Sequence, residues 1–310
     1  MIMKKAYYNG KEITSVAYQK GLDLSFYEDM DKIIQDGLFK ALEIEREWDS
    51  SITSLTGYLQ DRTEILFMPM VDTGNVTIWN SAFGSCEHLL TIPELDTSKA
   101  TNMNLCFHGC SSLRSIPMMD TKNVTNMYGT FMGCASLLTI PELDTSNVTS
   151  MGYCFYGCFN LETIPALNTE KVESFLGFLD GCLYLKRIEG LSFKSATGVN
   201  LITTDKDNSG YRGGIGIVVA YIKDIGYQSA CKELDFSMFL QWGDIYGGMT
   251  DGVIRYSDAK ESLLYTLLEN SFDRLSAGYP ECNITLSTKT KSLLSSSEIS
   301  QIELKGYNIL

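Results

Sequence analysis

Hydrophobic residues recur every 24 positions through the middle of this chain. Ile-Pro pairs keep this interval at Pro93, Pro117, Pro141 and Pro165. So do five cysteines, at Cys86, Cys110, Cys134, Cys158 and Cys182, and four phenylalanines with a following leucine, at Phe83, Phe107, Phe131, Phe155 and Leu179. A fixed period of this size is typical of a solenoid, in which each unit buries its apolar side only against its neighbours. The pattern therefore predicts a long displayed surface rather than a catalytic pocket.

Each repeat unit divides into an extended stretch, a turn and a compact returning arm. The LxxIPxL stretch offers Leu and Ile to the core, and its proline predicts a short strand or a strand end. The Asp-Thr pair that follows suits a turn, because Asp can accept hydrogen bonds from backbone N–H groups two residues later. The VTxMxxxFxGC arm has apolar residues three and four apart, which predicts a helical or 3₁₀ turn that closes at glycine.

The flanks of the repeats carry other periodicities. Asn9-Gly10 between apolar residues predicts a type I′ hairpin, and residues 25–47 read as one helix with a capping box at Ser25 and Glu28. Later, GGIGIVVAYI reads as a buried strand, residues 257–275 as a helix, NITLS as a strand, and Ser295 as the cap of a last helix before a closing strand. We expect an N-terminal hairpin and capping helix at 1–47, a solenoid at 48–191, an irregular Gly- and Asp-rich segment continuing it at 192–250, and a helix–strand cap at 251–310.

Charge and composition narrow the possible partners. The 310 residues are 44% hydrophobic, enough for a sizeable core, and the net charge is −13. An acidic chain repels phosphate backbones and anionic lipids, so we expect neither nucleic acid nor a membrane surface as a partner. No apolar run approaches the ~18–20 residues of a membrane span, and the N-terminus lacks the apolar stretch of a signal peptide. We therefore expect cytoplasmic synthesis without membrane insertion.

Residues that could carry chemistry are few. Cysteines at a repeated position are expected to be free, buried thiols. Zinc or a Cys–His nucleophile is not predicted, because His88 and His108 are the only histidines and stand inside repeat arms. Asp205 and Asp207 imitate the start of a calcium loop, but Gly216 stands where the bidentate Glu belongs, so we expect a solvated turn. No catalytic residue, metal or cofactor is predicted.

Two sets of repeated polar positions remain. The first is a row of acidic residues and one amide, which could line an ion or sugar site but is more often used to hydrogen-bond its own turns: Asp72, Asp96, Asp120, Asp144 and Asn168. The second set lies beside the fixed Leu and Ile positions and varies between units: Leu90, Thr91, Glu94, Arg114, Ser115, Met118, Leu138, Thr139, Glu142, Glu162, Thr163 and Ala166. If the extended stretches pair into a sheet, these side chains line its outer, concave face as a binding surface; plain solvated surface is the alternative.

The units, of the form IPxLDTSNVTSMxxxFxGCxxL, resemble the bacterial BspA-type leucine-rich repeats over about residues 59–191. The resemblance implies an α+β protein with a short right-handed leucine-rich-repeat solenoid, and an adhesion or recognition module with no catalytic residues to carry over. Members occur on bacterial surfaces and in phage and prophage proteins. The sequence departs from the family pattern in two respects: no export signal is seen, and residues 192–250 have no clear place in the repeats.

We therefore expect non-catalytic adhesion to a protein or glycan on a host or neighbouring cell, from a bacterial surface or a phage particle. The absence of a signal peptide favours the virion. The alternative is a structural virion component, such as a tail, fibre or head-decoration protein, whose repeats assemble with other virion proteins. A third hypothesis is an enzyme carried by residues 192–310, which would require a cluster of groups with shifted pKa values in a cleft there.

Overall fold

The computed structural model describes residues 6–8, 11–13, 40–41, 43–45, 47–185, 187–196, 219–223, 225–226, 231–236 and 256–310. At the start, β1 (Ala6–Tyr8) pairs antiparallel with β2 (Lys11–Ile13), which confirms the predicted hairpin; its Asn9-Gly10 turn lies outside the described residues. So do the calcium-like loop at Asp205 and Asp207 and most of the helix predicted over residues 25–47, of which residues 40–41, 43–45 and 47 are helical.

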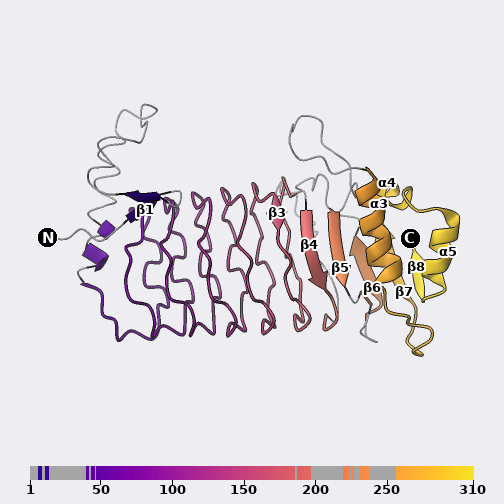
Figure 1. Cartoon of the computed structure of the whole chain (residues 1–310), viewed down its shortest axis with the longest axis horizontal. Coiled ribbons are helices and arrows are strands. Elements are labelled where there is room, and N and C mark those ends of the chain that lie inside the picture. The colour runs from indigo at the N-terminus through magenta and orange to yellow at the C-terminus, as the bar shows by residue number, and fades with distance from the viewer. Residues whose placement is uncertain are drawn as a thin grey trace.

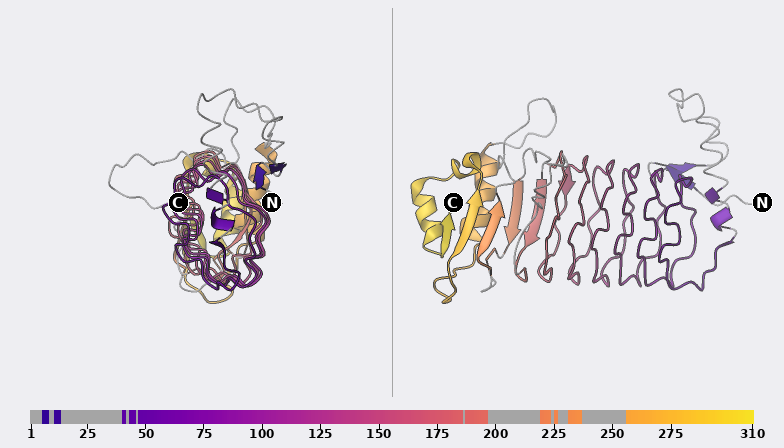
Figure 2. Two further views of the ribbon diagram at one scale, coloured as in Figure 1. Left: turned by 90° about the vertical axis from the view of Figure 1, so that its left-hand side faces the viewer. Right: turned by 180° about the vertical axis from the view of Figure 1, so that it is seen from behind.

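The repeats form a stack of turns, hereafter the stack, along a nearly straight axis (Figure 1). Residues 24 positions apart pair in parallel, and one ladder of bridges joins Ser54, Ile78, Asn102, Asn126, Ser150 and Ser174. A backbone hydrogen-bond ladder runs beside it: Thr101 donates to Thr77, Thr125 to Thr101 and Thr149 to Thr125, at 2.8–2.9 Å. Seen end-on, the turns superpose on one elongated ring (Figure 2). Residues 24 positions apart in the sequence therefore lie on directly adjacent turns of the backbone.

The returning arm consists of consecutive hydrogen-bonded turns, so the predicted helical or 3₁₀ geometry is wrong, whereas the predicted closure at glycine is confirmed by the positive φ of Gly109 and Gly133. Its N–H groups alternate between two acceptors: Cys106 donates within its own unit to Met103 (3.1 Å), whereas Phe107 donates to Thr130 of the next unit (2.9 Å). An α-helix would use all these donors internally and leave none for the neighbouring unit. Consecutive turns allow hydrogen bonds both within the unit and to the next unit. In each unit two residues four positions apart adopt positive φ, as Gly129 (φ 59°) and Gly133 (φ 76°) do.

The core consists of continuous columns of identical side chains. The rings of Phe83, Phe107, Phe131 and Phe155 stack with centroids 5.1–5.8 Å apart and planes within 7° of parallel. All nine cysteines are free and buried, which confirms the expected buried thiols. Each thiol of the repeated column donates to a phenylalanine or leucine carbonyl of the preceding unit, as Cys134 does to Phe107 at 3.1 Å. Burial raises the pKa of Cys134 far above its ordinary value, so these thiols are packing groups and not nucleophiles.

Toward its C-terminal end the stack leads into two parallel three-stranded sheets, in the orders β3-β4-β5 and β6-β7-β8, of which the first begins inside the repeats; several helices accompany them. In chain order these elements are β3 (Thr163–Ile164), β4 (Arg187–Ser192), β5 (Val219–Lys223), β6 (Glu233–Phe236), α3 (Tyr256–Leu264), the π-helical turn η1 (Tyr265–Glu269), β7 (Cys282–Leu286), α4 (Thr288–Lys291), α5 (Ser296–Glu303) and β8 (Tyr307–Ile309). The β7 strand and the Ser295–Glu298 capping box of α5 confirm the predicted strand and last helix. The α4 turn was not predicted.

The predicted helix over residues 257–275 ends early. It runs as α3, continues as η1, and stops at Asn270. Thr266 ties the end of the helix to β5, because its hydroxyl donates to the Ala220 carbonyl at 3.0 Å. Ser271 then forms a bridge with Ile225, which draws the chain out of helical geometry. Within the part of the chain that the structure describes, no helix has the length and apolarity needed to cross a membrane.

Candidate binding surface

The stack has two long sides with the core between them. On one side run the extended LxxIPxL stretches, whose Ile92 and Leu95 are buried while Glu94 is exposed. We call the outward side of these stretches the Ile-Pro face. On the other side run the returning arms, whose Met103 and Phe107 are buried in the same core. Each unit therefore presents two outward surfaces, one from its stretch and one from its arm.

All twelve predicted site residues reach the surface of the Ile-Pro face. Eight are exposed: Glu94, Arg114, Ser115, Met118, Leu138, Thr139, Glu142 and Ala166; four are half-buried: Leu90, Thr91, Glu162 and Thr163. Backbone hydrogen bonds hold neighbouring stretches side by side, from Leu138 to Arg114 (3.2 Å) and from Glu162 to Leu138 (3.0 Å). The structure thus brings the predicted set together on one side of the stack.

The Ile-Pro face is close to flat, and the predicted concave curvature is not seen (Figures 1 and 2). Its cause is the returning arm. A helix on that side would require about 8–10 Å per unit against about 4.8 Å for paired strands, and the mismatch would bend the stack. Here the arms are hydrogen-bonded to each other just as the stretches are, so both sides advance by the same distance per unit.

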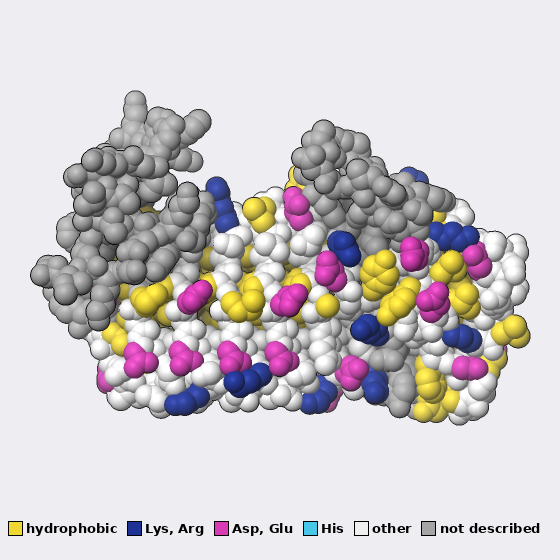
Figure 3. All heavy atoms as spheres, viewed as in Figure 1, with side chains coloured by type: hydrophobic (Ala, Val, Ile, Leu, Met, Phe, Trp, Pro, Cys, Tyr) yellow, Lys and Arg dark blue, Asp and Glu magenta, His cyan; other side chains and the backbone are white. Residues whose placement is uncertain are grey.

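Two rows of acidic side chains run along the stack, and in the upper one apolar side chains alternate with them (Figure 3). In each unit this alternating row contains the residue directly after the Ile-Pro pair, or after Met-Pro in the first unit. The residues are Met70, Glu94, Met118, Glu142 and Ala166. Met118 is the most exposed of the large apolar side chains of the stack, at 62%. Met70, also exposed, was missed by the sequence analysis. Because Met70 stands 24 residues before Glu94, in a degenerate unit, the repeat spacing could have predicted its place on this face.

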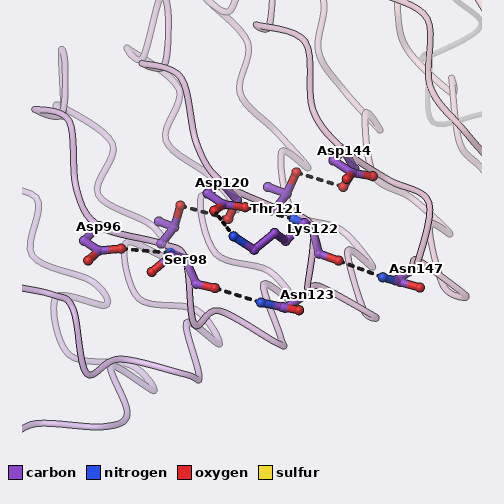
Figure 4. A network of polar contacts seen from close by, with 9 residues as sticks. Asp96, Ser98, Asp120, Thr121, Lys122, Asn123, Asp144 and Asn147 are labelled. Atoms are coloured by element: carbon purple, nitrogen blue, oxygen red, sulfur yellow. Dashed lines mark hydrogen bonds and ion pairs between the residues drawn. The ribbon is translucent and has the colours of Figure 1, made fainter.

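The lower row contains the repeated aspartates, which hydrogen-bond their own turns (Figure 4). Asp96 accepts from the backbone N–H of Ser98 and Asp144 from that of Ser146, both at 3.0 Å. Hydrogen bonds from the serine side chain and backbone lower the pKa of both carboxyls. Asn168 accepts the equivalent bond from Glu170 at 3.2 Å. This confirms the structural interpretation of the row.

A second set of bonds links each turn to the next unit. The buried hydroxyl of Thr97 donates to the carbonyl of Asp120 (3.0 Å), and that of Thr121 to Asp144 (2.9 Å). The Asn123 amide donates to Ser98 (2.8 Å). The Asp-Thr corner is thus a continuous polar seam whose groups serve the fold, and it leaves the Ile-Pro face as the candidate for binding.

We expect Asp144→Ala to lower the free energy of unfolding by about 0.5–1 kcal/mol, because the Ser146 N–H loses its acceptor. Asp144→Asn should change it by less than about 0.5 kcal/mol, because Asn168 already supports the same turn in the next unit. Urea unfolding at neutral pH measures both variants. An equal loss in the two variants would contradict the role of the turn bond.

The same pair has an expected pH dependence. The lowered pKa of Asp144 means that its ionised form contributes stability above the ordinary Asp pKa and loses it as the pH falls through the lowered value. The gap between wild type and Asp144→Ala should therefore narrow below about pH 4.

Elsewhere in the part of the chain that the structure describes, few side chains are placed to act chemically. Among the described residues, no three His, Cys, Asp or Glu side chains gather closely enough to hold a metal ion. His88 contacts the Thr63 carbonyl at 2.8 Å through Nδ1. In the C-terminal part, the interaction between the buried Cys231 and Cys282 thiols lowers the pKa of Cys231 and raises that of Cys282. Both histidines of the chain lie in the repeats, so this thiol pair has no imidazole base beside it.

A family model described as "Mycoplasma protein of unknown function, DUF285" matches residues 75–187, the regular part of the stack and well under half of the chain. No curated protein matches the chain. The match relates these units to a known repeat family, and the narrower identification as BspA-type leucine-rich repeats stays a prediction.

Proposed function

We propose that the protein is a non-catalytic recognition and adhesion protein and that its stack is a right-handed leucine-rich-repeat solenoid of the BspA type. It binds its partner, a protein or glycan on a host or neighbouring cell, through the Ile-Pro face, and it is displayed on a bacterial surface or a phage particle. The observation that carries the proposal is the gathering of twelve varied side chains on one regular face.

Rigidity of the Ile-Pro face supports binding. Its backbone is fixed by hydrogen bonds to the units on either side, and its inward side chains Ile116 and Ile140 are buried in the core. Side chains mounted on such a frame lose little further backbone entropy when a partner binds. The face is therefore ordered before its partner arrives.

The chemistry of the alternating row favours a protein partner. Met70, Glu94, Met118 and Glu142 place an apolar and an anionic side chain in turn, at steps of about 4.8 Å. A partner surface with basic and apolar side chains would complement this row, and the charged groups would set its register. The carboxylates disfavour anionic ligands.

The experiment measures binding of the labelled protein to host cells, bacterial cells and a glycan array. We expect the triple variant Arg114→Ala, Met118→Ala, Glu142→Ala to bind its cellular partner roughly tenfold more weakly or worse, because truncation of central exposed side chains weakens an interface most. A matched control replaces one exposed basic, apolar and acidic residue outside this face with alanine, at Lys232, Leu304 and Glu303. Equal binding by both triple variants would move the site away from the Ile-Pro face. Self-association without cell binding would favour a structural role.

A further inference from the structure

The returning arms form a surface without formal charge. Residues 100–110, 124–134 and 148–158 contain no Asp, Glu, Lys or Arg, although the chain as a whole carries a net charge of −13. The charged side chains of these units lie in the stretches and the Asp-Thr corners instead. A surface of this kind, repeated over three consecutive units, offers no electrostatic attraction to a charged partner.

Three tyrosines gather on this surface. The ring of Tyr153 lies 5.7 Å from that of Tyr128 at 68°, and 5.7 Å from that of Tyr156 at 66°. Tyr128 is 37% exposed, and Tyr153 and Tyr156 are half-buried. We call the arm surface around these three residues the tyrosine face. Edge-to-face contacts hold the rings against one another, so the cluster is a fixed aromatic platform.

Glycines of the following unit make room for the rings. A Cβ added at Gly152 would lie 3.3 Å from the Tyr128 ring, and one added at Gly177 would lie 2.5 Å from Tyr153. The rings therefore rest against the backbone of the neighbouring unit. Tyr153 itself has φ 54°, a left-handed conformation that bulky residues rarely adopt. Gly129 and Gly177 occupy the same position in adjacent units, so the fold does not require a side chain there.

Hydrogen-bonding groups recur in these arms two and three residues before the position of Tyr128. Asn102 and Asn126, which are bridge partners, each use Oδ1 to accept from a backbone N–H two residues on, at 3.0 Å. Their side-chain amide nitrogens donate to no other group that the structure describes. The hydroxyls of Thr125 and Thr149 donate to backbone carbonyls at 3.2 Å and keep oxygen lone pairs for accepting. Donors and acceptors thus repeat at the spacing of the units.

We propose that the tyrosine face binds an uncharged glycan. The C–H face of a sugar ring packs against an aromatic ring, and its hydroxyls both donate and accept, which matches the amide and hydroxyl rows. An acidic glycan would need a cation, and the arms of these three units supply none. A second copy of the chain is the less favoured occupant, because Asn and Thr side chains interrupt the apolar area. This site is separate from the Ile-Pro face and goes beyond the function proposed above.

The test uses the full chain on an array of neutral and acidic glycans, followed by titration calorimetry with the neutral oligosaccharide that binds best. The double variant Tyr128→Asn, Tyr153→Gly removes both rings. It also uses residues that the repeats already hold at these positions, at Asn104 and Gly177, so it should fold. We expect neutral glycan binding to weaken roughly tenfold or more, and wild-type binding to be insensitive to salt.

The triple variant Lys232→Ala, Glu303→Ala, Leu304→Ala, whose exposed residues lie outside both proposed faces, is the matched control and should retain neutral glycan binding. The inference is overturned if the wild type binds no neutral glycan, if it binds acidic glycans alone, or if the double variant binds as well as the wild type. It is also overturned if the control variant outside both faces loses the glycan to the same extent, or if the double variant abolishes self-association instead.

Discussion

Phe131→Ala should lower the free energy of unfolding by about 3–5 kcal/mol, the usual cost of truncating a fully buried aromatic side chain. Phe131 is 1% exposed and lies between Phe107 and Phe155, with ring centroids 5.8 and 5.7 Å away. Its removal leaves a cavity that interrupts the column, and neither neighbouring ring can close the gap because each is held by its own unit. Chemical denaturation followed by circular dichroism measures the loss.

Phe131→Leu is the matched control, because Leu179 occupies this position in a later unit. Its cost should stay near or below about 1.5 kcal/mol, as for other apolar replacements of similar volume. A loss for Phe131→Ala of less than about 1 kcal/mol would mean that the column contributes little to stability.

Core positions could be predicted from the sequence because identical side chains recur at one interval. Once Cys134 and Phe131 are seen to repeat every 24 residues, stacked backbones place each on its copy in the next unit. The Asp144 turn was predictable for a similar reason, since Asp favours local hydrogen bonds to its own backbone. In both cases local preference and repeat position favour the same structure.

The returning arm was mispredicted because its apolar spacing of three and four residues also suits a helix. What decides the outcome is competition for backbone donors, since the N–H of Phe107 bonds to the next unit rather than to its own. Positive φ at the repeated Gly133 and Gly157 positions is compatible with this, but glycine also ends helices. The flatness of the Ile-Pro face follows from the same feature and could not be predicted without it.

The tyrosine face was missed for a different reason. Tyr128 and Tyr153 stand at different positions of their units, so the repeat pattern does not align them, and only the stacking of adjacent arms brings their rings together. Two signals in the sequence could have found the face. One is the absence of charge from three consecutive arms; the other is the alternation of Leu105, Gly129, Tyr153 and Gly177 at one repeat position.

Deletion of one whole unit should leave a folded protein, whereas a deletion half as long should not. Removing residues 89–112 joins His88 to Leu113, which stands in the same phase as Leu89, so Phe83 can stack on Phe131. Each unit contacts only its neighbours, so the loss is one unit and one interface. Removing residues 101–112 instead deletes an arm and retains its stretch. This deletion breaks the phenylalanine and cysteine columns, and it leaves backbone hydrogen-bonding groups of the two neighbouring arms without partners.

Cooperative unfolding of these two deletions, compared with the wild type by circular dichroism and size-exclusion chromatography, tests the 24-residue stacking most directly. We predict a monomeric, cooperatively unfolding protein for the 24-residue deletion and an unfolded or aggregated one for the 12-residue deletion. A folded 12-residue deletion, or an unfolded 24-residue deletion, would contradict the stacking on which both proposed binding faces depend.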